Sequence, residues 1–328
     1  MREARTKLKG VAAVYHCITR TVAGEMLFDD VAKEVLRKMI WQVADFSGVD
    51  VLAYCVMSNH FHVLVRVSKR AKLSRSELVR RYRVLYAKSR SAYQPDPDVL
   101  EVILKGEMDE ALAKDWRERL ETRMGDVSEF MKTLKQRFSV WYNKSHDRYG
   151  TLWAERFKSV LVEDHPSCLK TVAAYIDLNP VRAGLVDDPA DYRWSTYGEA
   201  MGGQVLGQRA LARVFHREVW SDAVESYRMV LFGKGGSHQK IAQQRISRDE
   251  VVKVLASGGK VPVWLMLRCR VRYFTDGAIL GSKVFVREKG AALLKVKQAE
   301  EKRLSELPTS SGTDDISVWR SLRCERFS

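Results

Sequence analysis

The sequence predicts an α+β fold: an antiparallel sheet with helices on one face, followed by a smaller, mostly helical C-terminal domain. Three observations lead to this prediction. Short apolar, β-branched runs alternate with amphipathic runs of helical period over the first two hundred residues. The length of 328 residues is enough for a sizeable core and a second domain. After the glycine-rich stretch 202–207, helical patterns replace most strand-like ones.

The first part of the predicted sheet consists of three strands and one helix. Residues 29–48 have apolar positions at helical spacing, with Asp29 as the N-terminal cap and Gly48 as the stop signal. A short polar interruption at Ser58 and Asn59 separates the second strand from the third. Apolar and β-branched composition predicts the strands at 11–19, 49–57 and 60–67.

The second part of the predicted sheet contains one more strand, at 151–163. Asp164 as cap and Pro166 in the first turn predict a helix that runs to Asn179. Further helices are predicted at 99–124, 127–146, 210–232 and 246–257. The order strand, helix, strand, strand, helices, strand, helix suggests an antiparallel arrangement related to the ferredoxin-like split βαβ unit.

Three segments follow from this pattern. Residues 1–204 are predicted to form the main domain, with a basic insertion at about 69–126. Residues 205–307 are predicted to form an accessory domain that could bind DNA. Residues 233–237 are predicted to be a linker within it. Residues 308–328 are expected to be a flexible tail, because they are rich in Ser, Thr and Asp.

Net charge indicates a polyanionic partner. The chain has 56 Lys and Arg residues against 41 Asp and Glu, a net charge of +15, and its isoelectric point is about 9.6. Such a field attracts nucleic acid, because phosphates neutralised by cationic side chains release condensed counterions.

Five scattered cysteines, with no Cys-X-X-Cys pair, point to a reducing compartment and away from a thiolate metal site. No apolar run is long enough for a membrane span.

Two histidines stand out in the third predicted strand. His60 and His62 are two residues apart, so their side chains point to the same face, roughly 6 to 7 Å apart at the backbone. Two imidazoles placed in this way can bind one metal ion. An isolated His-X-His is more often a pair of ordinary sheet histidines, so the metal interpretation needs a third ligand.

Asn179 is the candidate for that third ligand, and Tyr175 lies near it in the sequence. They are four residues apart in a predicted helix and therefore share one face of it. An amide oxygen is a poor ligand for zinc but an acceptable one for Mg²⁺ or Mn²⁺. A tyrosine one turn before the amide would lie beside a metal-bound phosphate. His60, His62 and Asn179 are therefore the predicted metal ligands, and Tyr175 is the predicted nucleophile on a phosphodiester.

This set of residues resembles the HUH superfamily of single-strand nucleases, and most closely the REP-associated tyrosine transposases and the single-tyrosine transposases of small bacterial insertion sequences. The resemblance spans about residues 10 to 200 and rests on an ordered set of motifs. They are YHCITR at 15–20, HFH after VMSN, LKQRFSVWYNKSH at 134–146, WAERFKS at 153–159, AYIDLNPVRAGLV around Tyr175, and DYRWSTY at 191–197.

The resemblance implies a metal-dependent endonuclease and strand-transferase that acts on single-stranded, hairpin or palindromic DNA. The tyrosine would form a 5′-phosphotyrosine and release a 3′-hydroxyl, which conserves the energy of the phosphodiester for rejoining. It also implies a bacterial cytoplasmic protein associated with the nucleoid. The insertion and the C-terminal extension depart from the compact relatives, so a homodimer and a monomer both stay open.

Eight basic residues are predicted to contact DNA. Three of them belong to the insertion, where Tyr82, Tyr86 and Tyr93 are interleaved with Arg and Lys, a composition that suits stacking on single strands. A merely solvated basic face is the alternative. The predicted contacts are Arg20, Arg80, Arg81, Arg83, Lys132, Lys135, Arg156 and Lys158.

Three alternatives remain from the sequence. Tyr142 with His146 is a second candidate for a nucleophile and its neighbour, at the same spacing of four residues. A catalytically silent DNA-binding regulator could have the same fold. An RNA-binding module would account for the charge but not for Tyr175. His16, on the first strand, is taken as a structural residue that is either packed or near the phosphate, and His165 as a surface residue.

Overall fold

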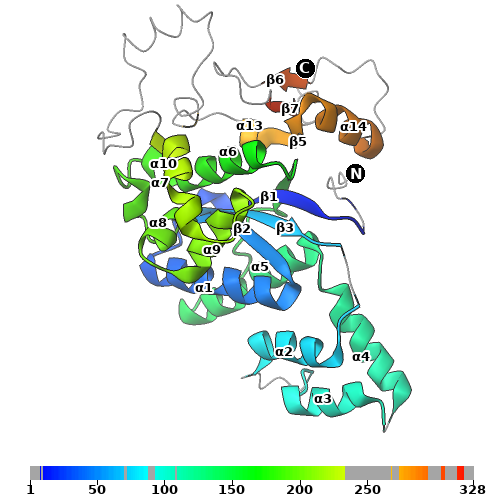
Figure 1. Ribbon diagram of the computed structural model, residues 1–328. Coiled ribbons are helices and arrows are strands. Elements are labelled where there is room, and N and C mark those ends of the chain that lie inside the picture. Colours follow the sequence, from blue (N-terminus) through cyan, green and yellow to red (C-terminus); the bar gives the residue numbers. More distant parts are fainter. Residues whose placement is uncertain are drawn as a thin grey trace, which may run out of the picture.

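The computed structural model describes residues 8, 10–69, 72–87, 93–107, 109–232, 267, 273–294, 304–306 and 316–320. These residues form a mixed α+β structure around one sheet (Figure 1), which confirms the predicted fold class. Seven strands follow one another across the sheet in the order β2-β3-β1-β4-β5-β7-β6. The linker at 233–237 and the helix predicted at 246–257 lie outside the described residues.

Four strands form the antiparallel part of the sheet. Their bounds are β1 Ala13–Arg20, β2 Val49–Val56, β3 His60–Val67 and β4 Lys158–Val162. β1 lies between β3 and β4 and is antiparallel to both. This spatial order, β2-β3-β1-β4, agrees with the ferredoxin-like arrangement predicted from the element order. The fourth strand is shorter than predicted, because residues 151–157 make only an isolated bridge from Trp153 to Thr21.

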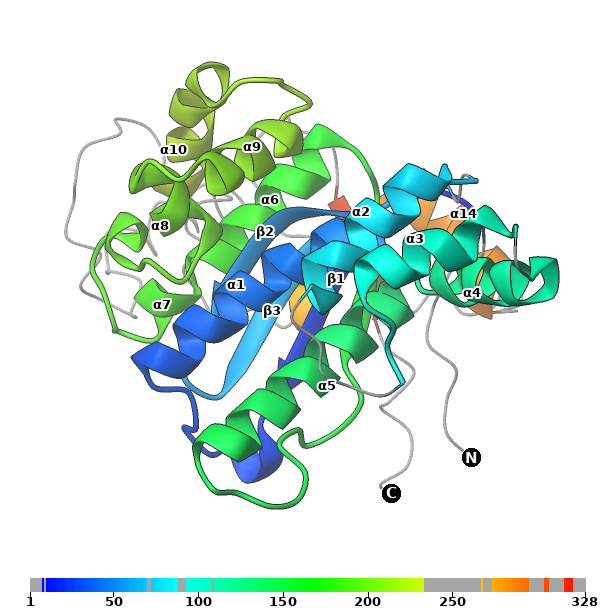
Figure 2. The same ribbon diagram turned by 90° about the horizontal axis from the view of Figure 1, so that it is seen from below.

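Two helices cover the first face of the sheet (Figure 2). α1 (Asp30–Ser47) begins after the Asp29 cap, whose carboxylate accepts from the Ala32 N–H at 2.7 Å, and ends at Gly48 in the left-handed conformation. α5 (Val127–Ser145) lies beside α1. Alternation along β3 directs Phe61, Val63 and Val65 to this face, where they pack with both helices.

Helices also cover the second face, which differs from the prediction of helices on one face only. α6 (Pro166–Asp177), α8 (Thr196–Met201) and α9 (Val205–Val214) pack on β2 from this side. They do so because alternate residues of the strands, including Val14, Leu52 and Leu64, are apolar on this face too. α7 (Asn179–Arg182) and α10 (Val224–Phe232) complete this layer around α6.

The predicted basic insertion forms three helices on the side of the molecule away from α6 (Figure 1). They are α2 (Arg75–Tyr86), α3 (Pro97–Lys105) and α4 (Glu110–Thr122). The single helix predicted over 99–124 is wrong, because Gly106 ends α3 in the left-handed conformation and Asp109 caps a new helix.

The described part of the C-terminal region adds helices and three strands to the main sheet. β5 (Gly277–Ser282) is parallel to β4, and β7 (Ile316–Arg320) is antiparallel to β5 and to β6 (Leu304–Glu306). α13 (Tyr273–Asp276) precedes β5, and α14 (Lys283–Leu294) follows it. The division at residue 204 stays a prediction, although beyond it α9 packs on β2 and α10 packs on α6.

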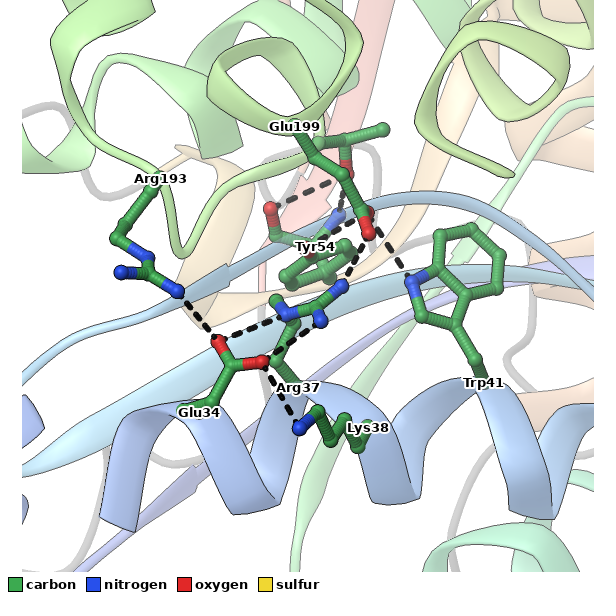
Figure 3. A network of polar contacts seen from close by, with 8 residues as sticks. Glu34, Arg37, Lys38, Trp41, Tyr54, Arg193 and Glu199 are labelled. Carbon is green, nitrogen blue, oxygen red and sulfur yellow. Dashed lines mark hydrogen bonds and ion pairs between the residues drawn. The ribbon is translucent and has the colours of Figure 1, made fainter. Parts of the chain in front are cut away.

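A polar network holds the outer edge of the sheet at β2 (Figure 3). The buried carboxylate of Glu199, on α8, accepts from Arg37, from Trp41 Nε1 at 3.1 Å and from the Tyr54 hydroxyl at 2.8 Å. Arg37 also pairs with Glu34 at 2.8 Å. Because Glu199 comes from one helical layer and Arg37 and Trp41 from the other, the network connects the two layers around the edge strand. A buried carboxylate needs such partners to offset its loss of hydration.

Candidate active site

The two histidines of β3 lie where strand register places two basic residues beside them. In the sheet, Arg20 is opposite His60 and Ile18 is opposite His62, and Lys158 of β4 is opposite Ile18. Directly opposed residues point to the same face, so Arg20 and Lys158 flank the histidine pair. The ring centroids of His60 and His62 are 5.1 Å apart. His62 is buried, and His60 is half-buried.

Tyr175 comes to the histidines from α6. The centroid of its ring lies 6.2 Å from that of His62 and 6.3 Å from that of His16. The helix is placed by His165, the residue before Pro166, whose Nδ1 accepts from the Ser167 N–H at 3.4 Å. The prediction that Asp164 caps this helix is wrong, because Asp164 instead pairs with Arg66 at 2.6 Å.

Asn179 follows Tyr175 by one helical turn, at the start of α7. Its amide nitrogen donates to the Ile176 carbonyl at 3.0 Å and to the Tyr175 carbonyl at 3.4 Å. The amide oxygen is therefore the end of the side chain that is suited to a cation. No cluster of three or more His, Cys, Asp or Glu side chains that could hold a metal occurs among the described residues. A side-chain amide oxygen such as that of Asn179 is a ligand type that suits Mg²⁺ or Mn²⁺.

His16, which the sequence suggested as a structural residue, has a specific polar role. Its Nε2 lies 3.0 Å from His62 Nδ1, and its Nδ1 lies 2.9 Å from the Phe274 carbonyl oxygen. Burial lowers the pKa of His16 to about 4, although the hydrogen bond to Phe274 raises it. Burial also lowers the pKa of His62 well below its ordinary value, and the neighbouring His60 lowers it further. Both imidazoles are therefore neutral at pH 7, the form that binds metals.

Arg182 places a buried positive charge against the nucleophile candidate. Its guanidinium carbon lies 4.1 Å from the centroid of the Tyr175 ring. Its nitrogens donate to the carbonyl oxygens of Tyr175 at 2.6 Å and of Leu267 at 2.7 Å. These bonds fix the guanidinium over the ring, where the two make a cation–π contact.

Two residues of the C-terminal region complete the site. The ring of Phe274 packs on that of Tyr175 at 4.6 Å, and Leu267 accepts the hydrogen bond from Arg182. Sequence reasoning did not find these residues or His16 and Arg182 as site components. The motif YHCITR could have indicated His16, since side chains alternate along a strand and Arg20 and His16 share a face. No local pattern indicates Phe274, because it acts through its backbone carbonyl and through a ring contact with a residue far away in the sequence.

The second candidate nucleophile lies on the opposite face of the sheet. Tyr142 packs with Phe28 and Phe138 in the core beneath α1 and α5, and its hydroxyl donates to the Leu27 carbonyl at 2.8 Å. His146 stacks on its ring at 4.0 Å. The structure thus brings Tyr175, and not Tyr142, to the histidine pair.

The predicted DNA contacts of the insertion lie far from this site. Arg80 pairs with Asp45 at 2.9 Å and with Glu77 at 2.8 Å, Arg81 pairs with Glu77 at 2.6 Å, and Arg83 pairs with Asp98 at 2.7 Å. The helix that carries them, α2, is on the other side of the molecule from α6 (Figure 1). Contact of these arginines with DNA stays a prediction.

Two of the three interleaved tyrosines of the insertion are not available as stacking platforms for bases. Tyr82 and Tyr86 are buried and stack on each other with centroids 4.5 Å apart. They are part of the hydrophobic core because they face α1, on the inner side of α2. Tyr93 is exposed and is the member of this set that could still stack on a base.

The remaining predicted DNA contacts lie on α5 and around β4. Lys132 pairs with Glu129 at 3.4 Å, Lys135 donates to the Glu155 carbonyl at 2.8 Å, and Lys158 pairs with Glu155 at 3.3 Å. Arg156 is exposed. Of these residues, Lys158 is the one that strand register places on the face of His62.

A buried acid next to the site makes stability depend on pH. Burial raises the pKa of Asp177 to about 7, although hydrogen bonds from the Tyr227 hydroxyl and the Tyr197 N–H favour its ionised form. In the unfolded chain this carboxyl titrates near pH 4. Between the two values the folded state binds a proton that the unfolded state has released, so the free energy of unfolding falls as pH rises.

Asp177→Asn removes this titration while keeping an oxygen acceptor. We expect its free energy of unfolding, relative to that of the wild type, to increase between about pH 4 and about pH 7 and to level off above. Urea unfolding at a series of pH values measures this difference. Glu218→Gln, at an exposed carboxylate, is the control. Parallel pH profiles for wild type and Asp177→Asn would contradict the assignment.

Comparison with known proteins agrees with the resemblance over the first part of the chain. The model of the family described as "Transposase IS200 like" matches residues 11–98, which contain His60 and His62 but not Tyr175. No curated protein matches the chain. No helix in the described residues has the length and apolar character needed to cross a membrane.

One solved structure is similar at a low level. It is titled "Structure of the REP associates tyrosine transposase bound to a REP hairpin". The alignment covers 62% of this chain and 86% of that one, with 15% sequence identity and a TM-score of 0.39. The chain therefore resembles IS200-like transposases within residues 11–98, and the rest of the site stands on its own geometry.

Proposed function

We propose that this chain, whose residues 11–98 match IS200-like transposases, is a metal-dependent single-stranded DNA endonuclease and strand-transferase. Tyr175 is the nucleophile, and His60, His62 and Asn179 are the ligands of Mg²⁺ or Mn²⁺. The substrate is hairpin or palindromic DNA, and the intermediate is a 5′-phosphotyrosine.

One observation supports this proposal most strongly. The centroid of the Tyr175 ring lies 6.2 Å from that of the His62 ring, although the two residues are far apart in the sequence. One phosphate group could therefore contact both Tyr175 and a cation held by His60 and His62. Proximity of this kind is the main source of rate enhancement when a bimolecular attack becomes intramolecular.

The chemistry follows from the residues present. The Tyr175 oxygen loses its proton to solvent, attacks the scissile phosphorus and forms a phosphorus–oxygen bond. The bond to the 3′ oxygen breaks, and that oxygen takes up a proton from solvent. A divalent cation held by His60, His62 and Asn179 would supply positive charge that stabilises the phosphate as charge builds up on it. Since one phosphodiester replaces another, a 3′-hydroxyl can reverse the reaction and rejoin strands without ATP.

Three cations of the chain support the reaction. Arg182, held over the Tyr175 ring by two carbonyl oxygens, places a fixed positive charge beside the nucleophile. Arg20 and Lys158, on the same sheet face as the histidines, suit the DNA backbone on either side of the scissile phosphate. The net charge of +15 supplies the wider attraction for DNA.

A covalent-adduct assay tests the function. Wild-type protein is incubated with Mn²⁺ and a 3′-labelled single-stranded hairpin, and we expect a labelled protein band that resists boiling in SDS. A fully paired duplex of the same sequence is the control. It should give little adduct, because paired bases hold the scissile strand away from a buried tyrosine. Equal adduct yields from duplex and hairpin would contradict the substrate class.

The burial of Tyr175 favours a second candidate function, a DNA-binding regulator that does not cut. The side chain of Tyr175 is only 7% exposed, and Phe274 packs on its ring. A nucleophile must reach its phosphate, so cleavage requires Phe274 to move or DNA to enter beside it. Tight binding of hairpin DNA with no adduct in Mg²⁺ or Mn²⁺ would decide for the regulator.

A further inference from the structure

A line of hydrogen bonds enters the site from the C-terminal region. It begins at the Phe274 carbonyl oxygen, passes through both nitrogens of His16 and ends at Nδ1 of His62. All three residues are buried, and His16 is 1% exposed. The two imidazoles lie nearly parallel, with centroids 5.2 Å apart. Each bond in this line has a direction that the chemistry of its atoms determines.

A carbonyl oxygen only accepts hydrogen bonds, so His16 Nδ1 carries a proton and donates to Phe274. A neutral imidazole has one proton, so His16 Nε2 is an acceptor. His62 Nδ1 must then carry the proton that His16 Nε2 accepts. In neutral His62 the second nitrogen, Nε2, is left as the one with a lone pair. A backbone carbonyl 212 residues along the chain from His62 thereby selects the His62 tautomer.

The same arrangement occurs at the other histidine. His60 Nδ1 lies 2.6 Å from the Asn59 side-chain oxygen. The orientation of that amide is set by its nitrogen, which donates to the Gly24 carbonyl at 3.0 Å. The Asn59 oxygen therefore accepts from His60 Nδ1, and in neutral His60 Nε2 carries the lone pair.

We propose that His16 and Asn59 are positioning residues that hold His62 and His60 as Nδ1-protonated tautomers and so direct the Nε2 lone pair of each toward a divalent cation. This inference rests on the proposed function, because it assigns the orienting partners of the proposed ligands. Histidine ligands commonly donate their second N–H to a carboxylate or a carbonyl. Here a second imidazole, itself oriented by a carbonyl, takes that place for His62.

Nuclear magnetic resonance of the metal-free full chain tests the tautomers directly. Long-range ¹H–¹⁵N spectra of ¹⁵N-histidine-labelled protein distinguish a protonated ring nitrogen from an unprotonated one, and the seven histidines can be assigned by substitution. We expect His62 and His16 both to carry the proton on Nδ1 at neutral pH. A proton on Nε2 of His62 in the wild type would overturn the inference, whatever the protein does with metal or DNA.

A matched pair of variants tests the effect on the cation. His16→Gln keeps an acceptor near the position of Nε2, whereas His16→Met has nearly the same shape without one. We expect His16→Met to weaken Mn²⁺ binding, measured by calorimetry without DNA, by about 10- to 100-fold. His16→Gln should stay within a few-fold of the wild type.

The outcomes separate this inference from the proposed function. Equal Mn²⁺ affinities for His16→Gln and His16→Met would show that the acceptor does not matter and would overturn the inference. If the wild type binds no Mn²⁺, the proposed metal site fails, and the nuclear magnetic resonance spectrum still decides whether His16 sets the tautomer of His62. If the Met variant does not fold, the same spectrum of the wild type decides.

Discussion

Tyr175→Phe is expected to eliminate both DNA cleavage and the covalent adduct. The substitution removes one oxygen and keeps the ring, so its packing against Phe274 and its contact with Arg182 persist. DNA affinity should stay within about two-fold, because the cations that attract phosphate are unchanged. Cleavage should fall by roughly 10⁴-fold or more, as is usual when a nucleophile is lost. Gel assays of labelled hairpin DNA, with parallel binding titrations, measure both quantities.

Tyr142→Phe is the matched control for this prediction. It also removes one phenol oxygen, but on the opposite face of the sheet, where that oxygen donates to the Leu27 carbonyl. We expect a stability loss of about 1 kcal/mol and no loss of cleavage. Peptide mapping of the wild-type adduct should place the DNA on Tyr175. An adduct on Tyr142, or full cleavage by Tyr175→Phe, would move the active site to the other pair.

His60→Ala is expected to abolish metal-dependent cleavage while the fold persists. His60 is half-buried at the end of β3, so its removal leaves a smaller packing defect than loss of the buried His62. Loss of a group that merely orients a ligand costs about 10- to 100-fold in metal affinity, so loss of a ligand should cost at least about 100-fold. Mn²⁺ titration and cleavage with increasing Mn²⁺ measure the effect, and EDTA should stop cleavage by the wild type.

His216→Ala is the control for a lost surface imidazole. His216 lies beside Asp164 and Arg66, outside the proposed ligand set. It should bind Mn²⁺ and cleave DNA as the wild type does. Undiminished cleavage by His60→Ala in EDTA would show that cleavage needs neither the metal nor the proposed ligands.

Local signals predicted the elements of the first half of the sheet well. The Asp29 cap and Gly48 stop bound α1 as predicted, and β3 spans His60–Val67 as predicted. Such signals work because caps and alternation are properties of a few adjacent residues. The split of 99–124 at Gly106 and the late start of β4 were missed. A glycine inside an apolar pattern is tolerated or breaks a helix according to the packing around it, which the sequence does not show.

In the site too, features set by local spacing were predictable and contacts between distant segments were not. Spacing along one strand and one helix suggested that His60 and His62 share a face and that Asn179 follows Tyr175, and the structure has this arrangement. Contacts between distant segments were not predictable. His16 acts through a strand register, Arg182 through two carbonyl oxygens, and Phe274 through its backbone and ring. Their side-chain types give no indication of these roles.

Charge was the least informative signal about particular residues. The stretch from Arg66 to Arg90 is strongly basic and has Glu77 as its only acid, but Asp45 and Asp98 also pair with its arginines. Those acids lie outside the run, on α1 and α3. Net charge therefore predicted the class of partner, while strand register identified Arg20 and Lys158 as the basic residues beside the histidines.

The hydrogen bond from His16 to Phe274 joins residues 258 positions apart. A ribosome makes roughly 5 to 20 residues per second, so the nucleophile and both histidines emerge seconds before the carbonyl that orients His16. Until the C-terminal region is synthesised and folded back, the nascent chain holds its reactive groups without this last constraint. A product of premature termination would lack it permanently. The distance along the chain thus makes synthesis beyond Phe274 a condition for a fully assembled site.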